Sequence, residues 1–378
     1  MSRTEGPDVP TRAAARAERR RRTRRKAMIG GAVVLVVVIG GAAVALSGGS
    51  ESAAPKQRTP PSTSTTTTTI PIPKAPLTGL ADPEGLSLTR QSLGVKIENT
   101  PEARPQTGLD VADVVYEEVV DGGVTRFWAF FNSAIPETVG PVRSVRAMDP
   151  QIVTPFGGVI AYSGGTEPNV AAIRATGLVW VDENNAGDSF FREPTRSSPH
   201  NLYARPASLL ERGGTPIPVA PVFQFLDPEQ GQTFVGEPIA SFHLNYELGY
   251  DASYVWDAAL GGWKRFQRTD EPFMAAGIPE TQVAPTNVVV QFTPYERFGE
   301  GNLFGTGEVW VFSNGQLIRG TWSRTDPAAP PLYTDAAGAP ILLTPGRTWV
   351  ELFPTGRTVD LVPGAPVAAA PTTVAPAP

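Results

Sequence analysis

A run of twenty apolar residues, 27–46, constrains this chain more than any other feature. It reads AMIGGAVVLVVVIGGAAVAL and contains no charged side chain. As a helix rising about 1.5 Å per residue, it would be roughly 30 Å long, which matches the hydrocarbon thickness of a bilayer. We therefore expect a transmembrane helix at 27–46 that anchors the rest of the chain to a membrane.

The basic residues before this run predict its orientation. Residues 19–26 read RRRRTRRK, and residues 1–26 hold ten Arg or Lys against three acids. Basic flanks stay in the cytoplasm. Residues 1–26 are thus predicted to be a cytoplasmic arm, and the chain a single-pass cell-membrane protein with its main domains extracytoplasmic. A cleaved signal peptide is the alternative, although its apolar core would be shorter.

Charge and cysteine content exclude several classes of function. The whole chain carries a net charge of −5, so a net of −12 falls on the residues after the basic arm. Attraction to anionic lipids explains the arm, and no motif indicates a nucleic-acid partner. The chain has no cysteine, which excludes disulfides, thiol nucleophiles and a lipid-modified cysteine. Two distant histidines do not form a metal-ligand pattern, so we expect no metal and no cofactor.

Composition divides the remainder into segments. Residues 47–76 are rich in Thr and Pro and predict an extended linker. Residues 364–378 predict a disordered tail. Between them we expect an α+β protein, with a mixed α/β domain at 77–215 and a mostly antiparallel, β-rich domain at 220–363.

Hydrophobic periodicity predicts the main elements of the first domain. Strands are expected at 93–99 and 157–165, and short helices at 168–177 and within 198–214. The stretch VADVVYEEVV-DGG-VTRFWAFF predicts a β-hairpin, because Asp-Gly-Gly supplies the positive φ angles of a tight turn. In the second domain the segments IASFHLNY, YVWD, WKRF, NVVVQF, GEVWVFSNG, QLIRGTW, PILL and TWVELF predict strands of a small sandwich or barrel.

Acidic residues in the first hairpin strand lie among valines. Alternation places Asp113 and Glu117 on one face of the strand, and Tyr116 and Glu118 on the other. A half-buried carboxylate needs a cationic partner or it becomes protonated. Acids on both faces therefore predict charged partners on both sides of the sheet.

Arginines close in sequence are the expected partners. Arg126 opens the second hairpin strand, and Arg143, Arg146 and Asp149 follow at intervals of three residues, which predicts one face of a helix or turn. One interpretation is an arginine cluster that binds an anionic ligand. The other is a buried ion-pair network that fixes the packing of the hairpin. The residues alone leave both open.

His200 is the candidate for acid/base chemistry. It lies in RSSPHNLYA, beside two serines, but the chain has no GxSxG elbow. The same segment is also typical of a turn that leads into a helix, in which the imidazole bonds a backbone carbonyl. A hydrolase would need His200 with a carboxylate, for which Asp113, Glu117 and Asp149 are the candidates.

Three long strings of residues resemble a known family. NTPEARPQTGLDVADVVYEEVVDGGVTRFWAFF, VGPVRSVRAMD and SPHNLYA are similar to the YerB-like family of bacterial envelope proteins, a domain of unknown function with N- and C-terminal parts. The resemblance spans roughly 77–355 and implies an exported, membrane-tethered protein with two adjoining domains. It supplies no reaction. The matching positions are Asn99, Arg104, Gln106, Asp113, Tyr116, Glu117, Gly123, Arg126, Arg143, Ser144, Arg146, Asp149, Pro199, His200 and Asn201.

These observations lead to a binding module as the expected function. We expect a groove that presents arginine, carboxylate and histidine side chains to a cell-wall fragment, an anionic glycopolymer or an envelope protein. A cell-wall hydrolase and a purely structural spacer are the alternatives. The expected ligand-binding residues are Asn99, Arg104, Tyr116, Glu117, Arg126, Arg143, Ser144, Arg146, Asp149, His200 and Asn201.

Overall fold

The structure is a computed structural model that describes residues 72–246, 249–277 and 279–365. The predicted cytoplasmic arm, the apolar run 27–46 and most of the linker and tail lie outside the described residues. Within those residues, no helix combines the length and apolar character that a membrane crossing requires. The anchor at 27–46 stays a prediction.

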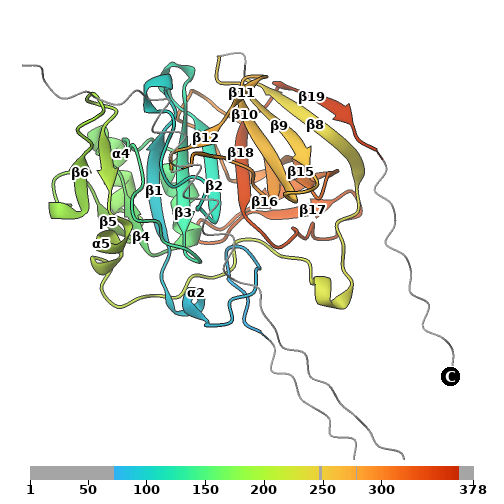
Figure 1. Ribbon diagram of the computed structural model, residues 1–378, viewed down its shortest axis with the longest axis horizontal. Coiled ribbons are helices and arrows are strands. Elements are labelled where there is room, and N and C mark those ends of the chain that lie inside the picture. Colours follow the sequence, from blue (N-terminus) through green and yellow to red (C-terminus); the bar gives the residue numbers. More distant parts are fainter. Residues whose placement is uncertain (1–71, 247–248, 278, 366–378) are drawn as a thin grey trace, which may run out of the picture. The chain divides into compact units, whose positions relative to one another are not determined.

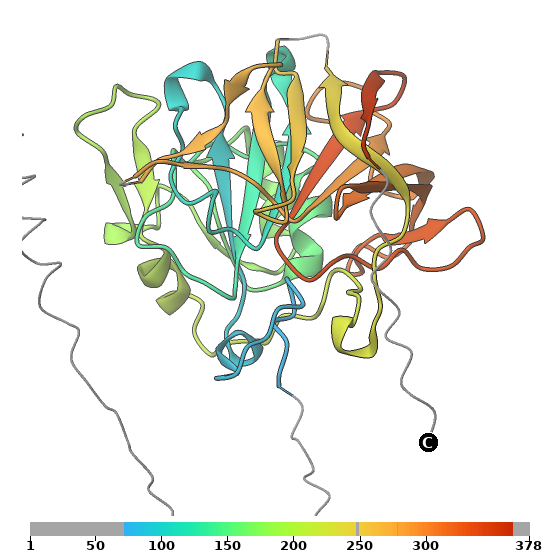
Figure 2. The same ribbon diagram turned by 45° about the vertical axis from the view of Figure 1, so that its right-hand side comes forward.

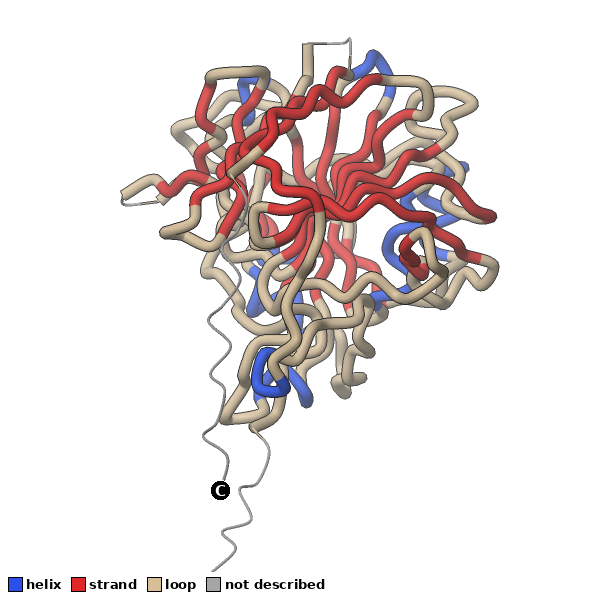
Figure 3. Tube along the Cα trace, turned by 90° about the vertical axis from the view of Figure 1, so that its right-hand side faces the viewer, coloured by secondary structure: helices blue, strands red, loops and turns tan. Residues whose placement is uncertain are grey.

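Strands dominate the described chain and the helices are short (Figure 3). The first half contains both kinds of element. Its strands are β1 (Leu93–Glu98), β2 (Val114–Val119), β3 (Thr125–Phe131), β4 (Val159–Ala161), β5 (Val179–Val181), β6 (Phe190–Arg192) and β7 (Leu202–Ala204). Its helices are α2 (Leu86–Thr89), α3 (Asp149–Val153), α4 (Glu167–Arg174) and α5 (Pro206–Glu211), with 3₁₀ turns η1 (Pro101–Ala103), η2 (Asp121–Gly123), η3 (Thr154–Phe156) and η4 (Gly187–Ser189).

The second half is built of strands, with one 3₁₀ turn, η5 (Pro228–Gln230), among its described residues. The strands are β8 (Glu237–Asn245), β9 (Ala252–Asp257), β10 (Gly262–Gln267), β11 (Glu271–Pro272), β12 (Met274–Ala275), β13 (Thr281–Gln282), β14 (Asn287–Thr293), β15 (Gly305–Ser313), β16 (Gln316–Arg324), β17 (Leu332–Asp335), β18 (Thr348–Pro354) and β19 (Thr358–Pro363). The predicted β-rich character of this half is confirmed.

One sheet runs through both halves. Within the described residues it contains 15 strands. Its main path is β11-β10-β9-β8-β16-β15-β14-β18-β2-β3-β1-β4-β5, while β17 pairs with β16 and β19 with β8 beside this path. The two halves meet where β18 pairs in parallel with β2, so that Glu351 lies opposite Glu117. Figure 1 and Figure 2 show the teal strands of the first half beside the red β18. The strands expected at 220–363 to form a separate sandwich or barrel therefore share one hydrogen-bonded sheet with the first half, because β18 pairs with β2.

The predicted hairpin is confirmed. Strands β2 and β3 pair antiparallel, with Glu118 opposite Arg126. The turn η2 contains Gly122 and Gly123 at φ angles of 76° and 75°, a conformation that favours glycine. This turn places the first residues of β3 next to the acidic end of β2.

The alternation in β2 divides the described core into two clusters, one on each side of the sheet. Val115 and Val119 pack into one cluster, and Val114 and Tyr116 into the other. Glu117 and Glu118 follow the same alternation, and both are fully buried. Acids on both faces of this strand were expected, and each lies among apolar side chains.

Several elements differ from their predicted lengths. The strand expected at 157–165 is reduced to β4, and the helix expected within 198–214 to α5. The strand predicted for PILL (340–343) is wrong, because this stretch makes only isolated bridges, such as Phe225 with Leu343. Pro340 cannot donate the backbone hydrogen bond that a regular ladder requires. Residues 143–146 are irregular rather than helical.

Candidate functional site

Three arginines converge at one end of the β1–β3 sheet, and we call Arg126, Arg143 and Arg146 the arginine cluster. Arg126 is the second residue of β3, and Arg143 and Arg146 lie in the irregular segment before α3. Backbone hydrogen bonds fix this segment, since Arg143 N donates to Lys96 O at 2.9 Å. Ser144 lies at the centre. Its hydroxyl accepts from Arg126 Nη1 at 3.2 Å and from Arg146 Nη1 at 3.1 Å.

The arginine cluster is partly open to solvent. The side chains of Arg143 and Arg146 are 23% and 16% exposed. Arg126 lies deeper and also donates from Nη1 to Ser144 O at 2.8 Å. Burial, followed by repulsion from Arg146 and Arg143, lowers the pKa of Arg126 to about 10. Guanidinium groups from two chain segments are thus held near one another at the surface.

Carboxylates neutralise only part of the cluster. Arg143 Nε lies 3.3 Å from Glu98 Oε1, and Arg146 Nε lies 2.7 Å from Asp121 Oδ2. The Asp121 side chain is 71% exposed, so solvent screens this second pair. Arg126 makes no ion pair with any residue that the structure describes. The buried carboxylates of Glu118 and Asp149 attract Arg126 from behind, but neither forms an ion pair with it.

His200 joins the cluster through Glu98. Its Nδ1 lies 3.0 Å from Glu98 Oε1, the atom that also faces Arg143. The imidazole is 20% exposed. The three carboxylates expected to work with His200, which are Asp113, Glu117 and Asp149, bond other groups. Glu98, the carboxylate that lies next to His200, was not among the site residues expected from the sequence.

A buried ion-pair triad lies behind the cluster. Lys96 bonds Glu118 and also Asp149, the latter at 2.8 Å, and all three side chains are fully buried. Asp149 Oδ2 accepts from Arg146 N at 2.7 Å. Burial and the charge of Asp149 raise the pKa of Glu118 to about 8. Asp149 is thus part of an internal network that supports the backbone of the cluster.

Other predicted residues lie on the opposite face of the sheet. Glu117 accepts from Arg265 Nη2 at 2.8 Å. Asn99 donates to Thr125 Oγ1 at 2.7 Å and accepts from Arg104 Nε at 3.1 Å. The sheet therefore separates Asn99, Arg104 and Glu117 from the arginine cluster.

A second carboxylate lies next to Glu117 at the junction of β2 and β18. Glu351 accepts from the hydroxyls of Tyr246 and Tyr254 at 2.7 and 2.5 Å. Burial and the charge of Glu117 raise the pKa of Glu351 to about 8. We call Glu117, Glu351, Arg265, Tyr246 and Tyr254 the junction cluster.

The remaining predicted residues serve local structure. Asp113 Oδ2 accepts from the backbone N–H groups of Asn132 and Ser133 at 2.6 and 2.8 Å. Tyr116 is buried in the core, which raises its pKa to about 12. Asn201 Oδ1 accepts from Arg192 Nη1 at 3.0 Å. These residues lie apart from the arginine cluster.

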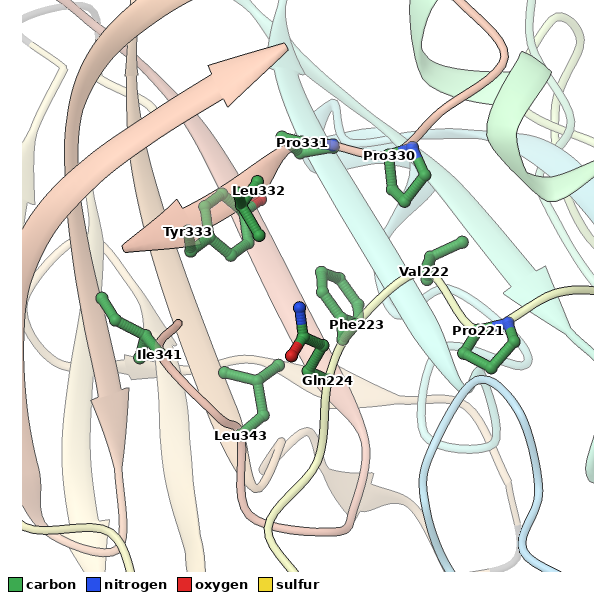
Figure 4. Close-up of a pocket in the computed structure, with 10 residues that line it drawn as sticks. All are labelled: Pro221, Val222, Phe223, Gln224, Pro330, Pro331, Leu332, Tyr333, Ile341 and Leu343. Carbon is green, nitrogen blue, oxygen red and sulfur yellow. The ribbon is translucent and has the colours of Figure 1, made fainter. Parts of the chain in front are cut away.

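Two cavities provide space for ligands. One, of about 460 Å³, is lined by Asp121 and Gly122 of η2 and by residues 295–298, and it borders Arg146 through its ion pair with Asp121. The other, of about 200 Å³, has mainly apolar walls (Figure 4). Figure 4 shows Phe223, Tyr333 and Leu343 around it, and no residue of the arginine cluster lines it.

Sequence interpretation missed several charged partners. Lys96 and Glu98 alternate with Val95 and Ile97 in β1, so their shared face could have been read from the strand pattern. Arg265 and Glu351 carried a weaker signal, since Arg265 follows Lys264 in β10 and Glu351 is the single charged residue of β18. Across the described residues, no group of three His, Cys, Asp or Glu is placed to hold a metal ion.

Comparisons with known proteins identify relatives over most of the described region. Two family models match, described as the N-terminal and C-terminal domains of a protein of unknown function (DUF3048), over residues 77–215 and 242–350. The chain is 27% identical over 300 residues to the Bacillus subtilis (strain 168) protein named "Putative lipoprotein YerB", covering 74% of this chain and 86% of that protein.

A solved structure shares the fold. The crystal structure of YerB protein from Bacillus subtilis matches with a TM-score of 0.64 and 23% identity, over 76% of this chain and 99% of that one. This similarity shows that the two chains share a fold.

Proposed function

Because the chain belongs to the YerB-like family, whose function is unknown, we propose a function from its own geometry. We propose that it is a membrane-associated envelope protein that binds an acidic group of cell-wall material at the arginine cluster. The name of the Bacillus subtilis relative, which calls it a lipoprotein, supports the membrane association. This chain has no cysteine for a lipid, so residues 27–46 are the proposed anchor.

The position of Arg126, beside two other guanidinium groups and without an ion pair among the described residues, is the observation that carries the proposal. A network that served packing alone would pair each cation with an anion, as the neighbouring Lys96 is paired. Arg126 instead faces two other guanidinium groups and forms no ion pair with the described residues. A bound anion would relieve this repulsion and accept several charge-assisted hydrogen bonds.

The anchor is tested by fractionating cells that express the full chain or a variant without residues 1–46. The full chain is expected in the membrane fraction and the shortened chain in the soluble fraction. A reporter fused to the C-terminus should be active outside the cytoplasm. A reporter that is active only in the cytoplasm would refute both the anchor and the envelope assignment.

Binding is tested with the full-length chain in detergent micelles, titrated calorimetrically with inorganic phosphate and with a purified anionic glycopolymer. The double variant Arg143→Ala/Arg146→Ala should weaken binding at least tenfold, since hydrogen bonds to charged groups contribute about 1.5–3 kcal/mol. The matched control is Lys264→Ala/Arg319→Ala, which removes two positive charges from exposed pairs in the second half.

Circular dichroism of the same variants separates binding from folding. The proposal requires the double cluster variant to keep the wild-type spectrum and melting curve while it loses affinity. Unfolding of that variant, or equal binding by the cluster and control variants, would show that the arginines serve packing.

His200 favours a second candidate function, a cell-wall hydrolase. With Nδ1 donating to Glu98, the other ring nitrogen is available to accept a substrate proton. Release of soluble fragments from purified peptidoglycan by the full chain would support this activity. It should disappear in His200→Ala and persist in His243→Ala, whose histidine bonds Ser253 in the second half. Absence of any release by the wild-type chain would refute the hydrolase.

A further inference from the structure

The cavity of about 460 Å³ next to the arginine cluster is lined in part by a segment that two hydrogen bonds attach to the sheet. Tyr295 donates its hydroxyl hydrogen to Leu352 O at 3.0 Å, and Gly299 N donates to Val119 O at 2.8 Å. These bonds attach residues 295–299 of the second half to strands β18 and β2. The cavity lies between this segment and the hairpin turn η2 and is open to solvent.

Arg146 connects the cavity to the arginine cluster. Its Nε faces Asp121, which lines the cavity, whereas its Nη1 bonds Ser144 at the centre of the cluster. The Arg146 side chain also lies against Gly299, since a Cβ at that glycine would be in van der Waals contact with Arg146 Cδ at 3.4 Å. The guanidinium of Arg146 therefore belongs to the arginine cluster and also borders the cavity.

The cavity lining has the chemistry of a sugar site. Tyr295 and Phe298 are half-buried and present aromatic surface, while Glu296 and Arg297 are exposed and offer charged acceptors and donors. Aromatic faces pack against the C–H surface of a sugar ring, and carboxylate and guanidinium groups pair with its hydroxyls. The volume lies in the usual range for small-molecule sites, about 300–1,000 Å³, and far exceeds the needs of a lone phosphate.

We propose that the ligand is an acidic saccharide, with its acid group on the arginine cluster and its sugar ring in the cavity lined by Asp121, Gly122 and residues 295–298. This inference rests on the proposed anion binding and adds the substrate class. It also makes the two halves of the chain contribute jointly to one site, because the hairpin and residues 295–298 come from different halves.

The test compares ligands that differ by one part each. The full-length chain in micelles is titrated with inorganic phosphate, glucose, glucose 6-phosphate and glucuronate. We expect glucose 6-phosphate or glucuronate to bind at least tenfold more tightly than phosphate or glucose. The two acidic sugars distinguish a phosphate ester from a carboxylate as the acid group.

Variants locate the sugar part of the site. Phe298→Ala should reduce the affinity for the acidic sugar to that for phosphate alone. The matched control is Phe191→Ala, which removes a partly exposed aromatic ring from β6 and should leave the affinity unchanged. Glu296→Ala, at an exposed position, repeats the test if Phe298→Ala does not fold.

The outcomes separate this inference from the proposed function. Equal binding of phosphate and the acidic sugars would overturn the saccharide assignment and leave anion binding intact. Binding of none of the four ligands at millimolar concentration would overturn both. Tighter binding of adenosine monophosphate than of glucose 6-phosphate would show that the cavity binds a nucleotide base rather than the ring of an acidic saccharide, and would refute the inference.

Discussion

The junction cluster makes the stability of this protein depend on pH, and Glu351→Gln tests this dependence. Glu351 lies opposite Glu117 in the parallel pair of β18 and β2, and Arg265 bonds Glu117 at 2.8 Å. Burial and the neighbouring carboxylate raise the pKa of Glu351 from its ordinary 4.5 to about 8. The folded protein therefore holds a proton here that the unfolded chain releases at neutral pH.

The sign and the size of the effect follow from this difference. Below pH 4.5 the carboxyl group is protonated in both states, and its contribution to stability is fully present. As the pH rises from 4.5 to 8, only the unfolded chain loses the proton. The free energy of unfolding then falls by roughly 1 kcal/mol per pH unit. A glutamine mimics the protonated acid, can still bond both tyrosines and does not titrate.

The assay is urea unfolding of the full chain in micelles at pH 5, 6, 7 and 8, followed by tryptophan fluorescence. Glu351→Gln should reduce the pH slope of the unfolding free energy by roughly 1 kcal/mol per unit. The slope will not vanish, because Glu118 also has a raised pKa. Glu237→Gln, at an exposed ion pair, is the control. Parallel pH profiles for wild type and Glu351→Gln would refute the reasoning.

Three further substitutions test features of the fold by the same unfolding assay. Lys96→Met should lower the unfolding free energy by about 3–5 kcal/mol, because it leaves two buried carboxylates without their cation; a loss below 1 kcal/mol would contradict this. Gly158→Ala should cost more than Gly338→Ala, since both glycines have positive φ but only at Gly158 would the new Cβ clash with a backbone carbonyl; equal losses would show that the backbone relaxes. Asp113→Ala should cost about 1–3 kcal/mol by leaving the buried N–H of Asn132 and the partly buried N–H of Ser133 without an acceptor, and an unchanged midpoint would disprove that role.

The sequence predicted local structure well, because local patterns contain that information. Asp-Gly-Gly between two β-branched runs predicted the hairpin, and the period of two in β2 predicted opposite faces for Glu117 and Glu118. The three-residue spacing of Arg143 and Arg146 predicted one face of a helix or turn, whereas they lie in an irregular segment around Ser144.

Partners distant in the sequence could not be predicted in this way. Lys96 and Glu118 are 22 residues apart, and Arg265 and Glu117 are 148 residues apart. A pattern along one strand shows that a buried acid needs a cation, but many cations satisfy that need equally well. Only the three-dimensional arrangement of the strands, which brings side chains of β1 and β10 to opposite faces of β2, determines which ones meet the acids.

The pairing of β18 with β2 also affects how the chain acquires its structure during synthesis. Trp349 and Glu117, which bond across this junction, are 232 residues apart. The ribosome synthesises β2 early and β18 near the end of the chain. One edge of β2 therefore remains unpaired until β18 has been synthesised. An open strand edge is a template for pairing with other chains. Nascent chains that stop before residue 348 should therefore be especially prone to aggregate or to engage chaperones.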